Sequence, residues 1–313
     1  MRFAIRDLYQ KNMNLLNFIN EYPDENSCRD HFRQQREAEG IKCKKCGSTN
    51  HYWLQPKWQW QCRKCNFRTT LRSGTIMKNA KLPIRTWYLT MAFMSFTKKG
   101  MSACELQRQI GHKRYESIWH MMHKIREAMG KRDNLYTLEG MIEMDEAYFE
   151  TATAASKKLK RGKGSQKQQN VAVFAESVPL EDIQTGRTSR HCRYFKMKVL
   201  QNHKSEGITD VVSRNIEQCS IMFTDKSTSY IDIADYVDVH ITEKSTKQTT
   251  KTTLQWVHIA ISNAKRTLLG IYHKIKGVYL QRYLDEFCYK LNRRYFNNNR
   301  FERLTIAVAK IYW

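Results

Sequence analysis

The stretch that decides the fold of the larger half of the chain is MIEMDEAYFE, residues 141–150. Alternation along this stretch predicts a strand, with Glu143 and Asp145 on one of its two faces. An acidic side chain in the middle of an apolar strand is costly unless it is paired or binds a cation. Asp145 is therefore a candidate metal ligand.

Further strands are predicted at 170–177, 193–200 and 220–230, the last an apolar strand ending in Asp225. Two aspartates at the ends or centres of adjacent strands can hold two divalent cations, which align water or a DNA 3′-hydroxyl for attack on a phosphodiester. Taken alone, each aspartate is more typical of a turn or a helix cap. The pair, following a cysteine cluster, favours the metal site.

The cysteine cluster lies upstream, as CKKC at 43–46 and CRKC at 62–65, separated by 15 residues. Each Cys-x2-Cys pair presents two thiolates to one ion, and two pairs make a closed tetrahedral zinc site. The spacing predicts a structural zinc ribbon over 41–75, with Cys43, Cys46, Cys62 and Cys65 as ligands. Residues 1–40, before the ribbon, are polar and are predicted to be helical.

A helical stretch is predicted over 80–135, and within it residues 102–129 show helix, glycine-containing turn at Gly111 and second helix. This pattern resembles a helix-turn-helix, although any helical hairpin gives the same signal. The basic residues expected to contact DNA there are Lys113, Arg114 and Lys124.

The formal net charge of +24 over 313 residues points to a polyanionic partner such as nucleic acid. A basic loop at 156–169, which contains Arg161 and Lys163, is a candidate contact for the DNA backbone. No apolar run approaches the ~20 residues needed to span a bilayer, and no signal peptide is visible. A cytoplasmic protein that is not associated with a membrane is expected.

In order along the chain, these motifs resemble the bacterial insertion-sequence transposases of the DDE superfamily, in the branch with an N-terminal zinc ribbon. The resemblance covers nearly the full length and is carried by these segments: EYPDENSCRDHF, CKKC…CRKC, LRSGTIMKNAKLPIRTWY, KKGMSACELQRQIGHKRYESIWHMMHKIREAM, IEMDEAYF, KRGKGSQKQQNVAVFAE, FTDKSTSY, NAKRTLLGIYHKI and YLDEFCYKLNRRYF. It implies a multi-domain α+β chain that ends in an RNase-H-like α/β catalytic domain at 140–313. It also implies Asp145 and Asp225 as the first two catalytic acids, a two-metal mechanism with Mg²⁺ or Mn²⁺, and a homodimer or higher oligomer on DNA.

The third ligand departs from the family pattern, because the helix predicted at 254–270 contains neither Asp nor Glu. His258 and Asn263 compete for the role. At 100° per residue, His258 and Lys265 lie within ~20° of each other, whereas Asn263 lies ~140° away from His258. A ligand and a phosphate-contacting lysine must share a side, so we favour His258 with Lys265. A neutral imidazole suits Mn²⁺ better than Mg²⁺.

Three further arginines are candidate phosphate contacts: Arg266 beside Lys265, and Arg293 and Arg294 at the end of a helix predicted within 279–296. The expected function is metal-dependent cleavage and strand transfer of DNA, with the terminal inverted repeats of the element and a target DNA as partners. The alternative is a domesticated, catalytically inactive regulator that keeps the zinc ribbon and binds DNA. The missing third acid favours that alternative, and Asp145, Asp225 and Lys265 argue against it.

Overall fold

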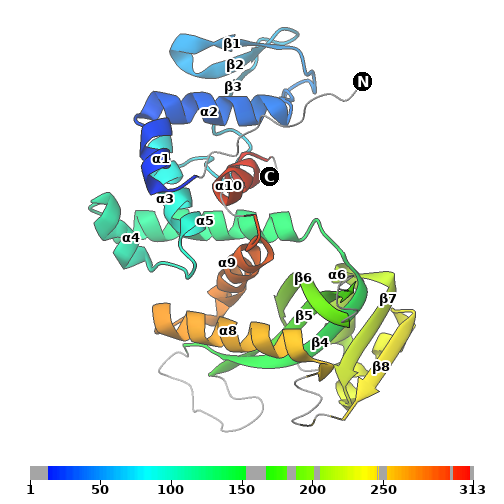
Figure 1. The fold of residues 1–313 in the computed structure, drawn as a ribbon. Helices are drawn as coiled ribbons and strands as arrows, with labels where there is room; N and C mark the ends of the chain where they lie inside the picture. Colours follow the sequence, from blue (N-terminus) through cyan, green and yellow to red (C-terminus); the bar gives the residue numbers. More distant parts are fainter. Residues whose placement is uncertain are drawn as a thin grey trace. The chain divides into compact units, whose positions relative to one another are not determined.

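The structure is a computed structural model, and it describes residues 13–152, 167–181, 188–200, 205–244, 246, 252–296 and 299–310. The chain divides into two compact units (Figure 1). The first contains Met1–Met129 together with Tyr295–Trp313, and the second contains Gly130–Arg294. No helix of the described residues is long and apolar enough to cross a membrane.

The first unit combines short helices with a small sheet. Its elements are α1 (Leu15–Glu21), α2 (Glu25–Ala38), β1 (His51–Leu54), η1 (Gln55–Lys57), β2 (Gln59–Cys62), β3 (Arg68–Thr70), α3 (Ile84–Phe96), α4 (Ala103–Ile110), most of α5 (Tyr115–Asp133) and α10 (Arg300–Ala309). The three strands form one antiparallel sheet in sequence order, as a ribbon requires. Helix α2 begins at a capping box in which Asp24 and Ser27 satisfy each other's backbone N–H groups.

Three arginines of α2 hold the ribbon, each over the ring of a different tryptophan. Their guanidinium groups lie 5.4, 4.6 and 5.6 Å from the ring centroids in the pairs Arg29–Trp58, Arg33–Trp53 and Arg36–Trp60. Arg36 is almost fully buried and also donates to the carbonyl oxygens of Leu71 and Ser73. These tryptophans therefore join the ribbon to α2, as cation–π pairs do at desolvated contacts.

Helix α10 packs in the first unit, although the sequence analysis assigned residues 140–313 to one catalytic domain. Its Phe301 is fully buried, and its ring lies 5.3–6.0 Å from the rings of Phe18, Tyr22, Tyr88 and Phe96. The physical reason is apolar burial, because α1 and α3 present an aromatic face that α10 covers.

The predicted helical hairpin is present as α4 and α5. Gly111 ends α4 in the left-handed conformation with φ of 69°, which glycine adopts without steric cost. Two polar side chains of α5 lie inside the fold, because His123 and Arg126 are each 1% exposed. The exposed basic residues lie instead in the turn before α5, at Lys113 and Arg114.

The second unit is built on a five-stranded sheet with the order β6-β5-β4-β7-β8. The strands are β4 (Leu138–Glu150), β5 (Gln168–Glu181), β6 (Thr188–Val199), β7 (Ile216–Asp225) and β8 (Val239–Glu243). Strands β4, β5 and β6 pair antiparallel, whereas β7 and β8 run parallel to β4. The predicted strand 220–230 thus ends at Asp225, and a 3-10 helix, η2 (Thr228–Asp235), follows it.

Helices cover both faces of this sheet (Figure 1). One face packs on α8 (Gln255–Ile271) and α9 (Leu280–Asn292), which η3 (Gly277–Tyr279) joins. The other packs on α6 (Ser205–Asn215) and η2. Since side chains alternate along β4, Asp145 lies on the face that α8 covers.

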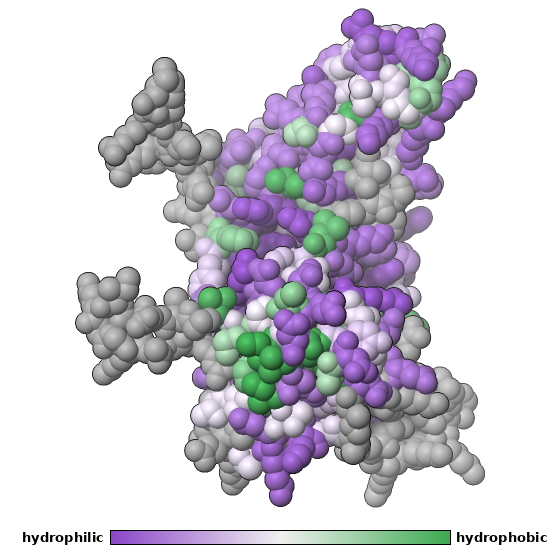
Figure 2. Space-filling view, turned by 90° about the vertical axis from the view of Figure 1, so that its right-hand side faces the viewer, coloured by the Kyte–Doolittle hydropathy of each residue, from purple (hydrophilic) through white to green (hydrophobic). Residues whose placement is uncertain are grey.

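The outer strand β8 was not expected from the sequence, and it leaves apolar side chains on the surface. Val239 and Ile241 are 44% and 37% exposed. They pair in register with Ile221 and Phe223 of β7, which are half-buried. Figure 2 faces this side of the molecule and shows a hydrophobic area within a mainly hydrophilic surface.

Candidate functional site

Two aspartates stand at neighbouring positions on the central parallel strands of the second unit. Strands β4 and β7 are paired in register as far as Glu143 and Phe223. Asp145 and Asp225 each follow two residues later on their own strand, on the same face of the sheet. The sheet thus brings together the two acids that the sequence analysis selected.

The Asp145 side chain is largely buried, and other carboxylates lie near it. Burial raises its pKa to about 6, and the nearby Asp225 and Glu146 carboxylates add to the rise. The backbone N–H of Glu146, 2.7 Å from Asp145 Oδ1, and the charge of Lys265 oppose it. A bound cation would relieve the same repulsion, because it compensates the charge of both carboxylates.

Asp225 Oδ1 is buried and has no hydrogen-bond partner among the described residues. A buried carboxylate oxygen without a donor is costly, and a cation is one partner that satisfies it. The oxygen chemistry of two carboxylates also suits Mg²⁺ and Mn²⁺.

His258, on the first turn of α8, approaches this pair. Its Nε2 atom lies 3.7 Å from Asp145 Oδ2, and the His258 side chain is 33% exposed. Burial lowers the pKa of His258, against an opposing effect of Asp225. The imidazole is therefore neutral near pH 7, and neutral is the form that binds a metal.

Asn263, the other candidate ligand, is engaged elsewhere on the same helix. Its Oδ1 atom accepts a hydrogen bond of 2.9 Å from Arg266 Nη2. Of the two candidates, His258 is the one whose side chain lies beside the Asp145 carboxylate. Among the described residues, only the four cysteines form a group whose ligand atoms all lie within 4.8 Å of one another. The ligand atoms of Asp145, Asp225 and His258 are therefore farther apart than that.

Lys265 follows His258 by seven residues and is exposed. Its Nζ atom lies 5.8 Å from the centroid of the Phe149 ring. It lines a cavity of about 640 Å³ together with Lys167, Lys274 and Tyr272. A basic hollow with aromatic side chains in its lining, about two helical turns along α8 from His258, is suited to a nucleic-acid strand.

A fully buried acid that the sequence analysis did not select lies between the strand and the helix. Glu143 is 0% exposed, and its Oε2 atom accepts hydrogen bonds from the backbone N–H groups of Trp256 at 2.7 Å and Val257 at 3.1 Å. Strand alternation alone did not separate Glu143 from Asp145, because both face the same side of β4.

The segment after Asp225 is tied to the strand that carries Asp145. Tyr230, in η2, makes a hydrogen bond with the Glu146 carboxylate, and the Asn170 side-chain amide donates to Glu146 Oε2. Burial, followed by the charges of Glu146, Asp145 and Asp225, raises the pKa of Tyr230, so its hydroxyl stays protonated and able to donate.

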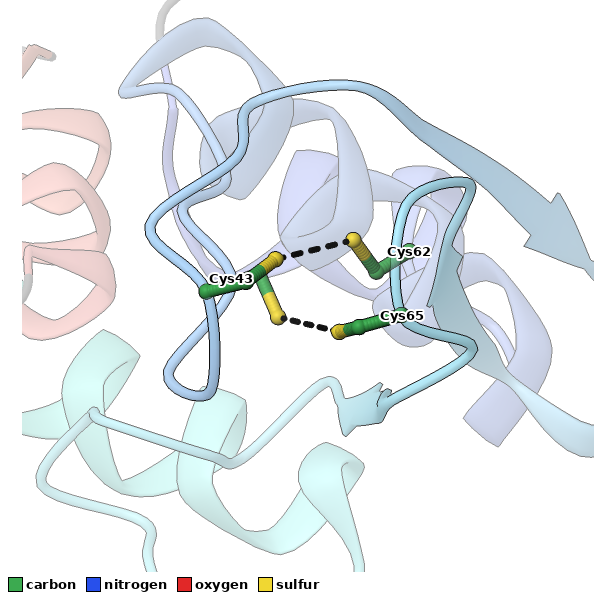
Figure 3. Close-up of side chains that lie close together, drawn as sticks. Cys43, Cys62 and Cys65 are labelled. Carbon is green, nitrogen blue, oxygen red and sulfur yellow. Dashed lines mark hydrogen bonds between the residues drawn. The ribbon is translucent and has the colours of Figure 1, made fainter.

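The four ribbon cysteines converge as their spacing predicted (Figure 3). Sulfur–sulfur distances are 3.5 Å for both Cys43–Cys65 and Cys46–Cys62, and all four sulfurs lie within 4.8 Å of one another. Tetrahedral zinc with bonds of about 2.3 Å requires sulfurs roughly 3.8 Å apart, so the cluster fits the ion.

The two knuckles use the same backbone turn. Gly47 and Asn66, each following the second cysteine of a pair, have φ of 70° and 58° and donate to the carbonyl oxygens of Cys43 and Cys62. Burial acts to raise the pKa of Cys43 and of Cys62, but hydrogen bonds from backbone N–H groups outweigh it and lower both pKa values. A backbone N–H of Phe67 acts to lower the pKa of Cys65, but burial and the other three sulfurs outweigh it and raise the pKa. The four thiols thus compete for negative charge, and zinc binds thiolates.

The structure separates the predicted DNA contacts into exposed and engaged residues. Lys113, Arg114 and Arg266 are exposed, whereas Lys124 is half-buried and donates to the carbonyl oxygen of Lys78. Arg161 and Lys163 lie outside the described residues.

Arg293 and Arg294, the other two candidate phosphate contacts, make contacts within the second unit, where Arg293 is buried and Arg294 is half-buried. Arg293 is 7% exposed, pairs with Asp133 at 2.7 Å and lies 3.5 Å from the centroid of the Tyr289 ring. Arg294 donates to the carbonyl oxygens of Cys192 and Leu291. The sequence did not reveal this, because their partners are distant in the chain or belong to the buried side of α9.

Residues 137–292 match the family model of the ISXO2-like transposase domain. The chain belongs to the insertion-sequence DDE transposases. The matched stretch contains the acids, His258 and Lys265, and it ends within the last turn of α9. In this transposase the zinc ribbon and the helical hairpin lie outside the matched residues.

No functionally curated protein matches the transposase sequence. Among solved structures, the Mos1 strand transfer complex is 9% identical, with a TM-score of 0.28 over 68% of this chain and 75% of that chain. A pre-cleavage Mos1 transpososome is also 9% identical, with a TM-score of 0.26 over 68% and 76% of the two chains. The mariner Mos1 paired end complex with Mg is 8% identical, with the same TM-score and coverage.

Proposed function

We propose that the chain is an active transposase that cuts the ends of an insertion sequence and joins them to target DNA. The observation that carries the proposal is the meeting of Asp145 and Asp225 on neighbouring parallel strands, with His258 Nε2 3.7 Å from Asp145. The strand order supports an RNase-H-like fold for the second unit, because three antiparallel strands are followed by two parallel ones. Exposed Lys265 and the net charge of +24 support DNA as the substrate.

Asp145, Asp225 and His258 would hold Mg²⁺ or Mn²⁺ in this proposal. The buried, partnerless Oδ1 atom of Asp225 and the neutral imidazole of His258 fit such an ion. The bound metal supplies Lewis-acid activation of the attacking oxygen and stabilises the leaving oxygen. A histidine in place of an acid lowers the negative charge of the site, so the affinity for metal is weaker and Mn²⁺ is preferred.

The remaining residues of the chain bind and orient the DNA. Lys265 contacts the backbone near the scissile phosphate, and Arg266 adds a less specific contact. Lys113 and Arg114, in the turn before α5, contact the terminal inverted repeat together with the zinc-bound ribbon. Phosphate contacts of this kind fix position, and base contacts in the repeat give specificity. The assembly on DNA is a homodimer or larger, acting in the bacterial nucleoid.

A cleavage and strand-transfer assay on DNA that carries the element's own end tests the proposal, with Mg²⁺ and Mn²⁺ in parallel. Asp225→Asn is expected to lower the rate by about 1,000-fold or more, because the metal loses a charged ligand. His258→Ala is expected to lower it by about 100-fold, with a larger loss in Mg²⁺ than in Mn²⁺.

Asn263→Ala is the matched control on the same helix, and it should stay within about twofold of wild type. A loss with Asn263→Ala equal to that with His258→Ala would move the third ligand to Asn263. Tight DNA binding without cleavage in either metal would instead identify an inactive DNA-binding protein and overturn the proposal.

A further inference from the structure

We infer that Glu143 is a positioning residue, which fixes helix α8 so that His258 faces the two aspartates. The inference rests on the proposed function, because it concerns the placement of a proposed metal ligand. Its starting observation is that one buried carboxylate oxygen accepts two successive backbone N–H groups at the beginning of α8.

Helix α8 has no cap of its own. Leu254 precedes the helix and makes no side-chain cap hydrogen bond, and the first turn contains no acidic residue. The first four N–H groups of a helix have no intrahelical acceptor, so a helix that begins inside a protein needs partners for them. Glu143 provides one acceptor from a different element, and it serves two of these N–H groups.

The bonded amides lie directly before the proposed ligand. Glu143 accepts from Trp256 and Val257, and His258 is the next residue. The backbone N–H of His258 makes an intrahelical bond to the carbonyl oxygen of Leu254. Rotation or sliding of α8 would break both bonds to Glu143 before it moved His258 appreciably.

Glu143 and Asp145 occupy the same face of β4, two residues apart and therefore roughly 6.7 Å apart along the strand. Glu143 of β4 is thus bonded to the backbone just before His258. The His258 side chain in turn lies close to Asp145 of the same strand, with 3.7 Å between Nε2 and Oδ2. Strand β4 thus carries the proposed ligand Asp145 and also Glu143, which sets the position of the helix that bears the proposed ligand His258. A carboxyl group buried this completely, 0% exposed, is costly unless its hydrogen bonds are kept, so the two bonds to α8 oppose displacement of the helix.

Mn²⁺ binding to the full chain, measured by the electron paramagnetic resonance signal of the free ion without DNA, tests the inference. Glu143→Gln keeps the side-chain volume and removes the charge. It is expected to weaken Mn²⁺ binding by about tenfold, in the range found when groups that orient metal ligands are altered. The control is Glu139→Gln on the same strand, whose side chain is 57% exposed, and it should leave binding unchanged.

A double-mutant cycle with His258→Ala separates positioning from simple charge loss. If Glu143 acts through His258, Glu143→Gln has no further effect on Mn²⁺ binding in the His258→Ala background. An equal effect in both backgrounds, or no effect of Glu143→Gln in the wild-type background, would overturn the inference.

Two further measurements keep the outcomes distinct. Mn²⁺ binding that survives Asp225→Asn would refute the proposed metal site itself, independently of Glu143. Amide hydrogen exchange at Trp256 and Val257 should become faster in Glu143→Gln and stay unchanged in Glu139→Gln, and unchanged exchange in both would also overturn the inference. If Glu143→Gln does not fold, Glu143→Asp replaces it, because the shorter side chain keeps the charge but not the reach.

Discussion

Some ionisable side chains of the second unit are largely removed from water. A small number of hydrogen bonds and ion pairs offsets the free-energy cost of removing them. Asp285, on α9, is a half-buried example. Its Oδ1 atom accepts from Gln281 at 2.8 Å, and a β-carbon added at Gly130 would lie 2.3 Å from its carboxylate. Glycine at position 130 therefore leaves the space that Asp285 fills.

Asp285→Asn is expected to stabilise the protein above pH 6 and to have little effect at pH 4. Burial raises the pKa of Asp285 to about 6, against the opposing charge of Lys198. A raised folded-state pKa contributes stability below the unfolded value that is lost as the pH rises through about 6, and asparagine avoids that loss. Urea unfolding at both pH values should show a gain of about 1–3 kcal/mol at pH 7.5 only.

The difference between mutant and wild type isolates Asp285 from other groups that titrate in the same window, including Asp145. An equal gain at pH 4 and pH 7.5 would mean that packing, and not ionisation, limits stability at this position.

Residue types selected Asp145 within an apolar strand and Asp225 at the end of another, and the helical phase shared with Lys265 favoured His258 as the third candidate. They did not reveal Glu143, which interrupts the same pattern in the same strand. Glu143 differs from Asp145 because the backbone N–H groups at the start of α8 lie against its carboxylate. That placement follows from the packing of α8 on β4, which the sequence pattern does not contain. The ion pair of Arg293 could not be predicted for a related reason, since its partner Asp133 is 160 positions away in the sequence.

At the scale of elements, the ribbon depends on α2 as much as on its cysteines. Three cation–π pairs join them, and Trp60 Nε1 donates to Glu37 of α2 at 2.9 Å. The spacing of the cysteines predicted the ribbon, because the ligand geometry is local. The docking on α2 could not be predicted, since arginines at these positions are equally typical of a solvated helix.

Cys65→Ser is expected to lower the bound zinc from about one ion per chain to far below one, because a site with three thiolates binds more weakly. Zinc per chain is measured by inductively coupled plasma mass spectrometry after dialysis. Cys104→Ser is the control, since Cys104 is exposed on α4 and lies outside the cluster. Equal zinc content in both variants would rule out the four-cysteine site.

At the scale of the whole molecule, the chain leaves the first unit, builds the second and returns. The expected boundary at residue 140 is close to the observed one at Gly130, but the return of Tyr295–Trp313 was not expected. Periodicity identifies a helix and its apolar face, and it contains no information on which distant face that helix will cover. The five-residue strand β8 was missed because it is short and half exposed.

Phe301→Ala is expected to destabilise the first unit by about 3–5 kcal/mol, because it leaves a cavity among four aromatic rings. Hydrogen exchange of peptides from α1 and α3 should accelerate, whereas peptides from β4 and β5 should be unaffected. Replacement of Arg303, which is exposed on the same helix, by alanine provides a comparison within α10. Unchanged exchange in α1 and α3 would show that α10 does not complete their core.

The return of α10 has a consequence for synthesis on the ribosome. Phe18 and Tyr22 emerge early, but Phe301 emerges only after every residue of the second unit has been translated. At 5–20 residues per second, that interval is roughly 15–55 s. During it the segment that carries the ribbon lacks helix α10, so the aromatic core of the first unit stays incomplete until the residues of α10 have been translated.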